Sequence, residues 1–161
     1  LTSSEEDGSI VYRKIDWPEE WTLTVCIPEY ELSTDISRSV LPKEVPMQDA
    51  VYNAQRMGMF IQAVHTRDSA LMKLALKDRL HQPYRMKLVP EKIIENLKHE
   101  ENVLGCVLSG AGPSILIISE KNNLDRIKAI VRDTWNDLNV KAEILTLPVE
   151  KQGAQVISND E

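Results

Sequence analysis

Two short apolar runs, residues 104–108 and 115–118, are separated by a loop of small and turn-forming residues. Runs of this length and composition are typical of buried strands. Glycine, proline and serine are residues that mark turns. The loop consists of Ser109, Gly110, Ala111, Gly112, Pro113 and Ser114. We therefore predict two strands joined by this loop, which the remaining elements must cover.

Those remaining elements are predicted from periodicity and from breaking residues. β-branched residues over 22–27 predict a strand that Pro28 ends. Residues 47–64 have the period of an amphipathic helix. Its apolar stripe contains Val51, Ala54, Met57, Gly58, Ile61 and Val64. Other predicted segments are a hairpin over 1–15, helices over about 69–77, 90–100 and 124–138, an irregular stretch over 80–85 and a last strand over 140–147.

The order of these elements defines the fold class. It is a strand, a long helical segment, two strands, a helix and a strand, which is the βαββαβ order of ferredoxin-like domains. We predict an α+β fold with a four-stranded antiparallel sheet and its helices on one face. The expected strands lie near 22–28, 104–108, 114–119 and 140–147. The predicted parts are a hairpin and linker left from a preceding domain over 1–20, the domain over 21–150 and a tail over 151–161.

Charge and composition exclude several classes of function. The net charge of −6 argues against nonspecific nucleic-acid binding, which depends on neutralising phosphates. No window of about 18 apolar residues predicts a membrane span. Cys26 and Cys106 lie in apolar runs, so we expect buried, reduced thiols. His65, His81 and His99 lack metal-ligand spacing, so no metal site is predicted.

Three segments carry residues suited to binding an anion. Gly110 and Gly112 can turn backbone N–H groups toward one point, although a plain hairpin turn explains them equally well. Thr34 and Arg38 are four residues apart, so one helical turn places them on one face. Arg85 follows a bend at Pro83. A guanidinium group binds two oxygens of a carboxylate or phosphate, while a solvated loop with a capping serine or threonine is the alternative for the segment of Thr34 and Arg38.

Together, these segments resemble the C-terminal half of homoserine kinases, which are members of the GHMP kinase family. The similar segments are 33–38 followed by Leu41 and Pro42, then 82–85, 105–114 and 153–156. The resemblance implies phosphoryl transfer from ATP to the hydroxyl of L-homoserine, which forms O-phospho-L-homoserine for threonine biosynthesis. It also implies that Thr34 and Arg38 lie at the amino-acid site.

The resemblance assigns further roles to single residues. Arg38 and Arg85 would hold the substrate carboxylate, and Gly110 would offer a backbone contact. The loop around Gly110 would lie against the substrate and the phosphates. The loop residues concerned are Ser109, Ala111, Gly112 and Ser114. No catalytic residue is assigned within these 161 residues.

The chain also departs from the family. The Pro-x-x-x-Gly-Leu-Gly-Ser-Ser loop that cradles the ATP phosphates does not occur in it, and neither do the family's adenine pocket and magnesium-linked acidic groups. We expect an N-terminal half that precedes Leu1 to bind most of the ATP and Mg²⁺. Phosphoryl transfer depends on positioning and charge stabilisation, so the chain alone is expected to be inactive. Its apolar interdomain face is expected to bind that half or a second copy in a homodimer, in the cytoplasm or plastid stroma.

Two other functions remain open at this point. Non-catalytic amino-acid-binding regulatory modules share the βαββαβ order, and a fold does not fix a function. Another GHMP small-molecule kinase, for mevalonate or a sugar, would share the glycine loop. Such substrates lack an α-amino acid group, so two arginines directed at one carboxylate favour homoserine.

Overall fold

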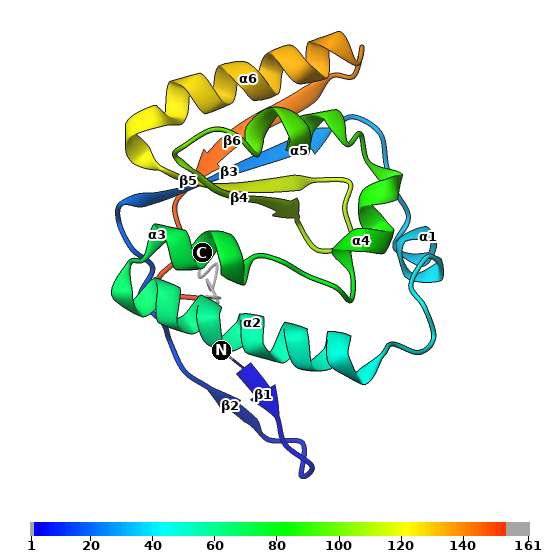
Figure 1. Cartoon of the computed structure of the whole chain (residues 1–161), viewed down its shortest axis with the longest axis vertical. Coiled ribbons are helices and arrows are strands. Elements are labelled where there is room, and N and C mark those ends of the chain that lie inside the picture. Colours follow the sequence, from blue (N-terminus) through cyan, green and yellow to red (C-terminus); the bar gives the residue numbers. More distant parts are fainter. Residues whose placement is uncertain (1, 154–161) are drawn as a thin grey trace, which may run out of the picture.

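The computed structural model describes residues 2–153, and its main sheet has the predicted order (Figure 1). Four antiparallel strands lie in the order β4-β5-β3-β6. This is the strand order of a ferredoxin-like sheet, so the predicted fold class is confirmed. The strands are β3 (Trp21–Pro28), β4 (Val103–Leu108), β5 (Ile115–Glu120) and β6 (Ala142–Leu147).

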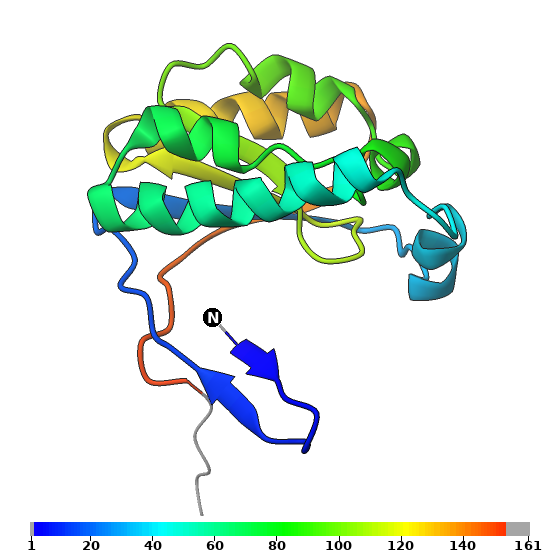
Figure 2. The ribbon, with the colours of Figure 1, turned by 60° about the horizontal axis from the view of Figure 1, so that its bottom comes forward.

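A separate two-stranded sheet forms the beginning of the chain (Figure 2). It pairs β1 (Thr2–Ser4) with β2 (Ile10–Tyr12) around a turn, as the sequence predicts. Its strands do not pair with the main sheet. The division into a hairpin, a domain and a tail is compatible with this arrangement and stays a prediction. The family-like segment at 153–156 lies mostly outside the described residues.

The helices lie in the connections between the strands of the main sheet. Asp68 caps α3, because its carboxylate accepts a hydrogen bond of 2.9 Å from the backbone N–H of Leu71. The stretch predicted to be irregular over 80–85 contains a short helix, α4. The helices are α1 (Thr34–Ser39), α2 (Met47–Thr66), α3 (Ser69–Ala75), α4 (Gln82–Arg85), α5 (Lys92–Leu97) and α6 (Leu124–Asp137), with 3₁₀ turns at Met86–Leu88 and Lys121–Asn123.

One face of the sheet is covered by α5 and α6. Alternate residues of the strands, such as Cys26 and Ile117, point to this face and are fully buried. Helix α6 contributes the largest side chain, Trp135, which is 1% exposed. The other buried members of this core are Ile93, Leu97, Val103, Ile115, Ile127 and Val131. This part of the fold follows the predicted arrangement.

Helices α2 and α3 pack against the opposite face, which corrects the expectation that all helices share one face. Ile118, the neighbour of Ile117 on β5, packs here with Trp21 and with Met72 of α3. Gly105 explains the close approach of α3, because a Cβ at this position would overlap the side chain of Leu76. The long connection between β3 and β4 therefore supplies helices to both faces.

The apolar stripe of α2 lies mostly outside the core. Amphipathic helices usually bury such a stripe, yet Val51 is 47% and Met57 54% exposed. The buried residues of α2 are Ala63 and Val64, near its C-terminal end. The stripe residues nearer the start of α2 therefore stay outside the core.

The two cysteines are expected to be unreactive in the folded chain. Strand β5 lies between them, because Cys26 pairs with Ile115 and Cys106 pairs with Ile117. Two strand spacings place them about 10 Å apart, beyond the reach of a disulfide. Burial raises the pKa of each thiol to about 12, and the nearby Cys26 adds to the shift of Cys106.

Alkylation at pH 8 measures this expectation. A thiol with a raised pKa has little reactive thiolate, so we expect labelling of the native chain to be slow and labelling in urea to be fast. Cys106 keeps some exposed surface and Cys26 keeps none, so Cys106 should react first of the two. Native labelling as fast as that of the unfolded chain would contradict this.

Candidate functional site

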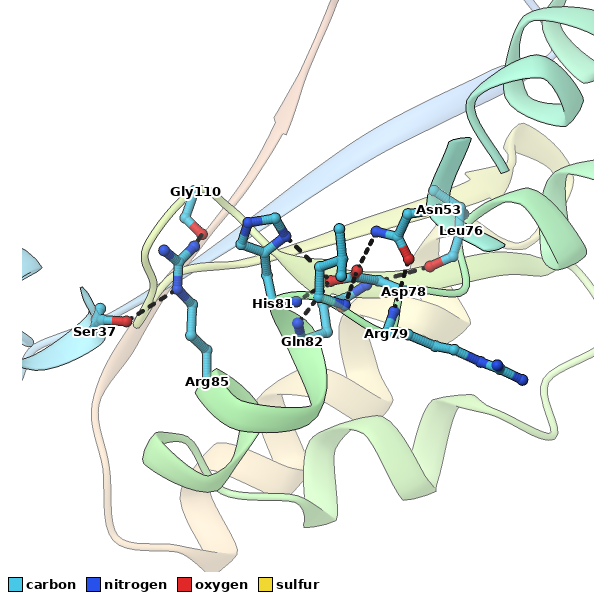
Figure 3. A network of polar contacts seen from close by, with 10 residues as sticks. Ser37, Asn53, Leu76, Asp78, Arg79, His81, Gln82, Arg85 and Gly110 are labelled. Atoms are coloured by element: carbon cyan, nitrogen blue, oxygen red, sulfur yellow. Dashed lines mark hydrogen bonds and ion pairs between the residues drawn. The ribbon is translucent and has the colours of Figure 1, made fainter. Parts of the chain in front are cut away.

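Three segments that are distant in sequence meet at one end of the sheet (Figure 3). Arg85, at the end of α4, lies at their centre and is half-buried. Its Nε donates to the carbonyl of Ser37 at 3.1 Å, and its Nη1 donates to the carbonyl of Gly110 at 3.3 Å. The hydroxyl of Ser37 donates to the carbonyl of Ala111 at 2.9 Å. These contacts join α1, α4 and the glycine loop.

Local sequence explains why α1 forms and where it presents its side chains. Ser33 is the N-cap, and its hydroxyl accepts the backbone N–H of Ile36 at 3.1 Å. Asp35 in the first turn and Arg38 in the last turn have the charges that a helix dipole favours. Thr34 and Arg38 are both exposed. Within residues 2–153 the Arg38 side chain has no hydrogen-bond or ion-pair partner.

Asp78 holds the start of α4 and therefore the place of Arg85. Its Oδ2 accepts the backbone N–H groups of His81 at 2.9 Å and Gln82 at 2.7 Å. Its Oδ1 accepts the N–H of Leu80 at 2.7 Å and the side-chain amide of Asn53 at 2.5 Å. Burial alone would raise the pKa of Asp78, but the hydrogen bonds from Asn53 and from the three backbone groups outweigh it and lower the pKa.

Contacts from α2 and α3 extend this support (Figure 3). Asn53 of α2 also accepts the backbone N–H of Arg79 at 3.0 Å, so both ends of its amide are used. Gln82 donates from its side chain to the carbonyl of Leu76, just after α3, at 3.2 Å. Arg85 is thus held through α4 to α2 and to the end of α3 on one side. On the other side it is bonded to Ser37 of α1 and to Gly110 of the glycine loop.

The glycine loop is closed by its own backbone. The N–H of Ser109 donates to the carbonyl of Ser114 at 2.9 Å, and the N–H of Gly112 donates to the carbonyl of Ser109 at 3.2 Å. Gly110 and Gly112 have φ of +64° and +84°, which favour glycine. The hairpin interpretation thus accounts for Ser109 and Gly112, and their N–H groups are not directed at an external anion.

An open groove of about 660 Å³ lies beside these segments. Ser33 and Ile36 of the α1 region line one part, and Ser114 of the loop lines another. Tyr30 also lines it, and burial raises the pKa of its phenol. A larger cavity of about 870 Å³ lies near the other end of β3, between residues 14–20 and 149–153, and contains none of the predicted site residues.

Two supporting residues, Ser37 and Asp78, escape the sequence-based prediction. Ser37 is one serine among several in a polar segment, so no pattern distinguishes it. Asp78 carries a recognisable signal, because an aspartate a few residues before Gln82 and Pro83 is typical of a helix start. Thr34, Arg38, Arg85 and Gly110 do lie on segments that the structure brings together. Their roles toward a substrate stay a prediction.

Within residues 2–153, no group of three or more His, Cys, Asp or Glu side chains is arranged to hold a metal ion. In the same part of the chain, no helix is both long and apolar enough to cross a membrane.

Comparison with known proteins shows which proteins this chain resembles. Residues 60–137 match the family model described as GHMP kinases C terminal. The chain is 35% identical to the homoserine kinase of Persephonella marina over 97% of its own length and 52% of that protein's. It is also 35% identical to the homoserine kinase of Aquifex aeolicus, over 98% of the chain and 53% of that protein. The chain spans about half the length of the curated relatives it matches.

A solved structure agrees with this resemblance. The crystal structure of homoserine kinase from Cytophaga hutchinsonii has a TM-score of 0.83 to this chain, at 24% identity. The similarity covers 94% of this chain and 48% of that one, and at this identity it shows the fold. Residues 60–137 of the chain are therefore similar to the C-terminal domain of GHMP kinases. Within that class, the chain resembles homoserine kinases along nearly its whole length.

Proposed function

We propose that this chain is the substrate-side half of a homoserine kinase. The complete enzyme transfers a phosphoryl group from ATP to the hydroxyl of L-homoserine and forms O-phospho-L-homoserine, a step of threonine biosynthesis. One observation carries the proposal. In a chain that resembles homoserine kinases throughout, Arg85 joins the segment of Thr34 and Arg38 to the glycine loop.

The two arginines suit the carboxylate of an amino acid in different ways. Arg38 is exposed and has no partner in the described chain, so its whole guanidinium is available. Arg85 uses two of its five N–H donors on carbonyls, which leaves donors for one further anion. The carboxylate would bind between them, with Thr34 one helical turn from Arg38. Gly110 would contact the substrate through its backbone, and the loop from Ser109 to Ser114 would face the phosphates.

ATP and Mg²⁺ are assigned to another part of the complete enzyme. The 161 residues contain no Gly-Leu-Gly-Ser-Ser phosphate loop. The exposed stripe of α2, which includes Val51 and Met57, is a surface suited to a nucleotide-binding half. A second copy of the chain is the alternative partner for this surface. We place the enzyme in the cytoplasm or plastid stroma, without a nucleic-acid or membrane partner.

An activity comparison tests this proposal. The purified 161-residue chain should form no phosphohomoserine from ATP and homoserine, because the phosphate-binding loop is missing from it. The longest natural gene product that contains the chain should form it. Mevalonate, galactose and serine serve as competing acceptors, and they distinguish homoserine kinases from other small-molecule kinases.

Two outcomes would contradict the proposal. Turnover by the purified chain alone would show that the nucleotide site lies within it. A complete gene product that binds amino acids but phosphorylates none would favour a regulatory module, which shares the βαββαβ order.

A further inference from the structure

The carbonyls of the glycine loop are held from outside the loop, and Ser37 holds one of them. Ser37 has no exposed surface, although it belongs to the short, mostly exposed helix α1. Its hydroxyl donates to the carbonyl of Ala111, 74 residues away in sequence, at 2.9 Å. Its own carbonyl accepts Nε of Arg85 at 3.1 Å. A single buried residue is therefore bonded to both other segments of the candidate site.

These bonds determine the orientation of the loop peptides. In a trans peptide, the C=O of one residue and the N–H of the next point in opposite directions. Because the carbonyl of Gly110 faces Arg85, the N–H of Ala111 faces away from it. Because the carbonyl of Ala111 faces Ser37, the N–H of Gly112 faces the carbonyl of Ser109, which accepts it at 3.2 Å. Ser37 and Arg85 thus orient two successive peptides.

We infer that Ser37 is a positioning residue, which orders the glycine loop against α1 before a substrate binds. It does not touch the substrate in this arrangement, because its hydroxyl is buried and occupied by Ala111. Its effect on catalysis passes through the loop and through Arg85. The inference rests on the proposed function for the identity of the substrate, but the tethering of the loop does not depend on that function.

The variant Ser37→Ala removes one oxygen atom and leaves the partly buried carbonyl of Ala111 without its donor. Loss of this bond opens the loop more often, so amide hydrogen exchange at Ser109 and Gly112, whose N–H groups are bonded within the loop, should be about 5- to 30-fold faster. Ser39→Ala is the matched control. Ser39 lies on the same helix, is exposed, and donates only to the carbonyl of Ile36, so it should leave exchange in the loop unchanged.

Kinetics of the complete kinase provide the second measurement. We expect Ser37→Ala to lower kcat/KM for homoserine by about 5- to 30-fold, as the loop must be ordered on binding. The KM for ATP should not change. Ser37→Cys, which keeps a weak donor of similar size, should restore part of the loss. A purely structural role would lower stability and leave the homoserine kinetics of the folded enzyme intact.

The outcomes separate this inference from the proposed function. Unchanged hydrogen exchange in Ser37→Ala would overturn the tethering of the loop. Faster exchange with normal homoserine kinetics would overturn the positioning role, and a homoserine defect in Arg38→Ala would then leave the proposed function standing. The inference is supported if Ser37→Ala lowers kcat/KM for homoserine, Ser37→Cys restores part of it, and Ser39→Ala leaves it unchanged.

Discussion

Replacing Arg38 or Arg85 with alanine is expected to lower kcat/KM for homoserine in the complete kinase by about tenfold to a few hundredfold. Each change removes a charge-assisted hydrogen bond to the carboxylate, worth roughly 1.5–3 kcal/mol. The KM for ATP should be nearly unchanged, because the proposed contacts are with the amino acid. Steady-state kinetics with each substrate varied in turn measure both effects.

The two arginines should differ in their effect on stability. Arg38 is exposed and makes no contact with a partner in the described chain, so Arg38→Ala should change the free energy of unfolding by less than about 0.5 kcal/mol. Arg85→Ala also removes the bonds to Ser37 and Gly110. It should therefore show the larger catalytic loss and a lower Tm.

A lysine at either position should recover only part of the activity, because a point charge cannot reproduce the bidentate guanidinium fork. The control is Arg132→Ala, since Arg132 is exposed on α6 and distant in sequence from the candidate site. Normal kcat/KM for homoserine in both alanine variants, or a defect confined to ATP, would remove Arg38 and Arg85 from the substrate site.

The strands were predictable because each has a strong local signal. The β-branched run of β3 ends at Pro28, and the apolar runs of β4 and β5 flank a loop marked by Gly110 and Gly112. Each strand boundary lies within a few residues of its prediction. The βαββαβ order then limited the sheet to few arrangements, and the observed one is the ferredoxin-like order.

The faces of the sheet were less predictable than its strands. Periodicity identifies the apolar side of a helix but not the surface that covers it. For α2, the apolar stripe with Val51 and Met57 is exposed, and the buried contacts come from Ala63 and Val64. An apolar stripe intended for another domain has the same sequence pattern as one intended for the core.

The charged residues of the candidate site could be predicted from the sequence, but the residues that hold them in place could not. Arg38 and Arg85 belong to family-like segments, and a guanidinium has an evident use. Ser37 has no such signal, because its importance comes from burial and from a contact with Ala111 across 74 residues. Long-range contacts of a common residue type leave no local pattern.

The largest effect on stability is expected for Asp78→Ala. The change deprives three backbone N–H groups and the Asn53 amide of their acceptor. Loss of a helix cap together with bonds to a charged acceptor should lower the free energy of unfolding by about 2–4 kcal/mol, because such terms are not fully additive. For a chain of this size, the Tm should fall by about 5–15 °C.

Asp78→Asn is not a conservative change at this position. An asparagine keeps one acceptor oxygen, but its amide would turn donor hydrogens toward the N–H groups that Asp78 now accepts. We therefore expect Asn to recover little of the stability. Asp137→Ala is the matched control, because Asp137 is exposed and pairs only with Lys92 on the surface at 3.0 Å. Asp137→Ala should lower the free energy of unfolding by less than about 1 kcal/mol.

The pH dependence identifies the charge of Asp78 as the source of the effect. Its pKa is lowered in the folded chain, so its contribution is fully present above the unfolded pKa of about 3.9 and is lost as the pH falls through the lower folded value. The difference in unfolding free energy between the wild-type chain and Asp78→Ala should therefore shrink below about pH 4. Denaturant titrations at several pH values measure it. A difference that stays constant down to pH 2.5, or a Tm within about 1 °C of wild type, would show that the carboxylate does not hold α4.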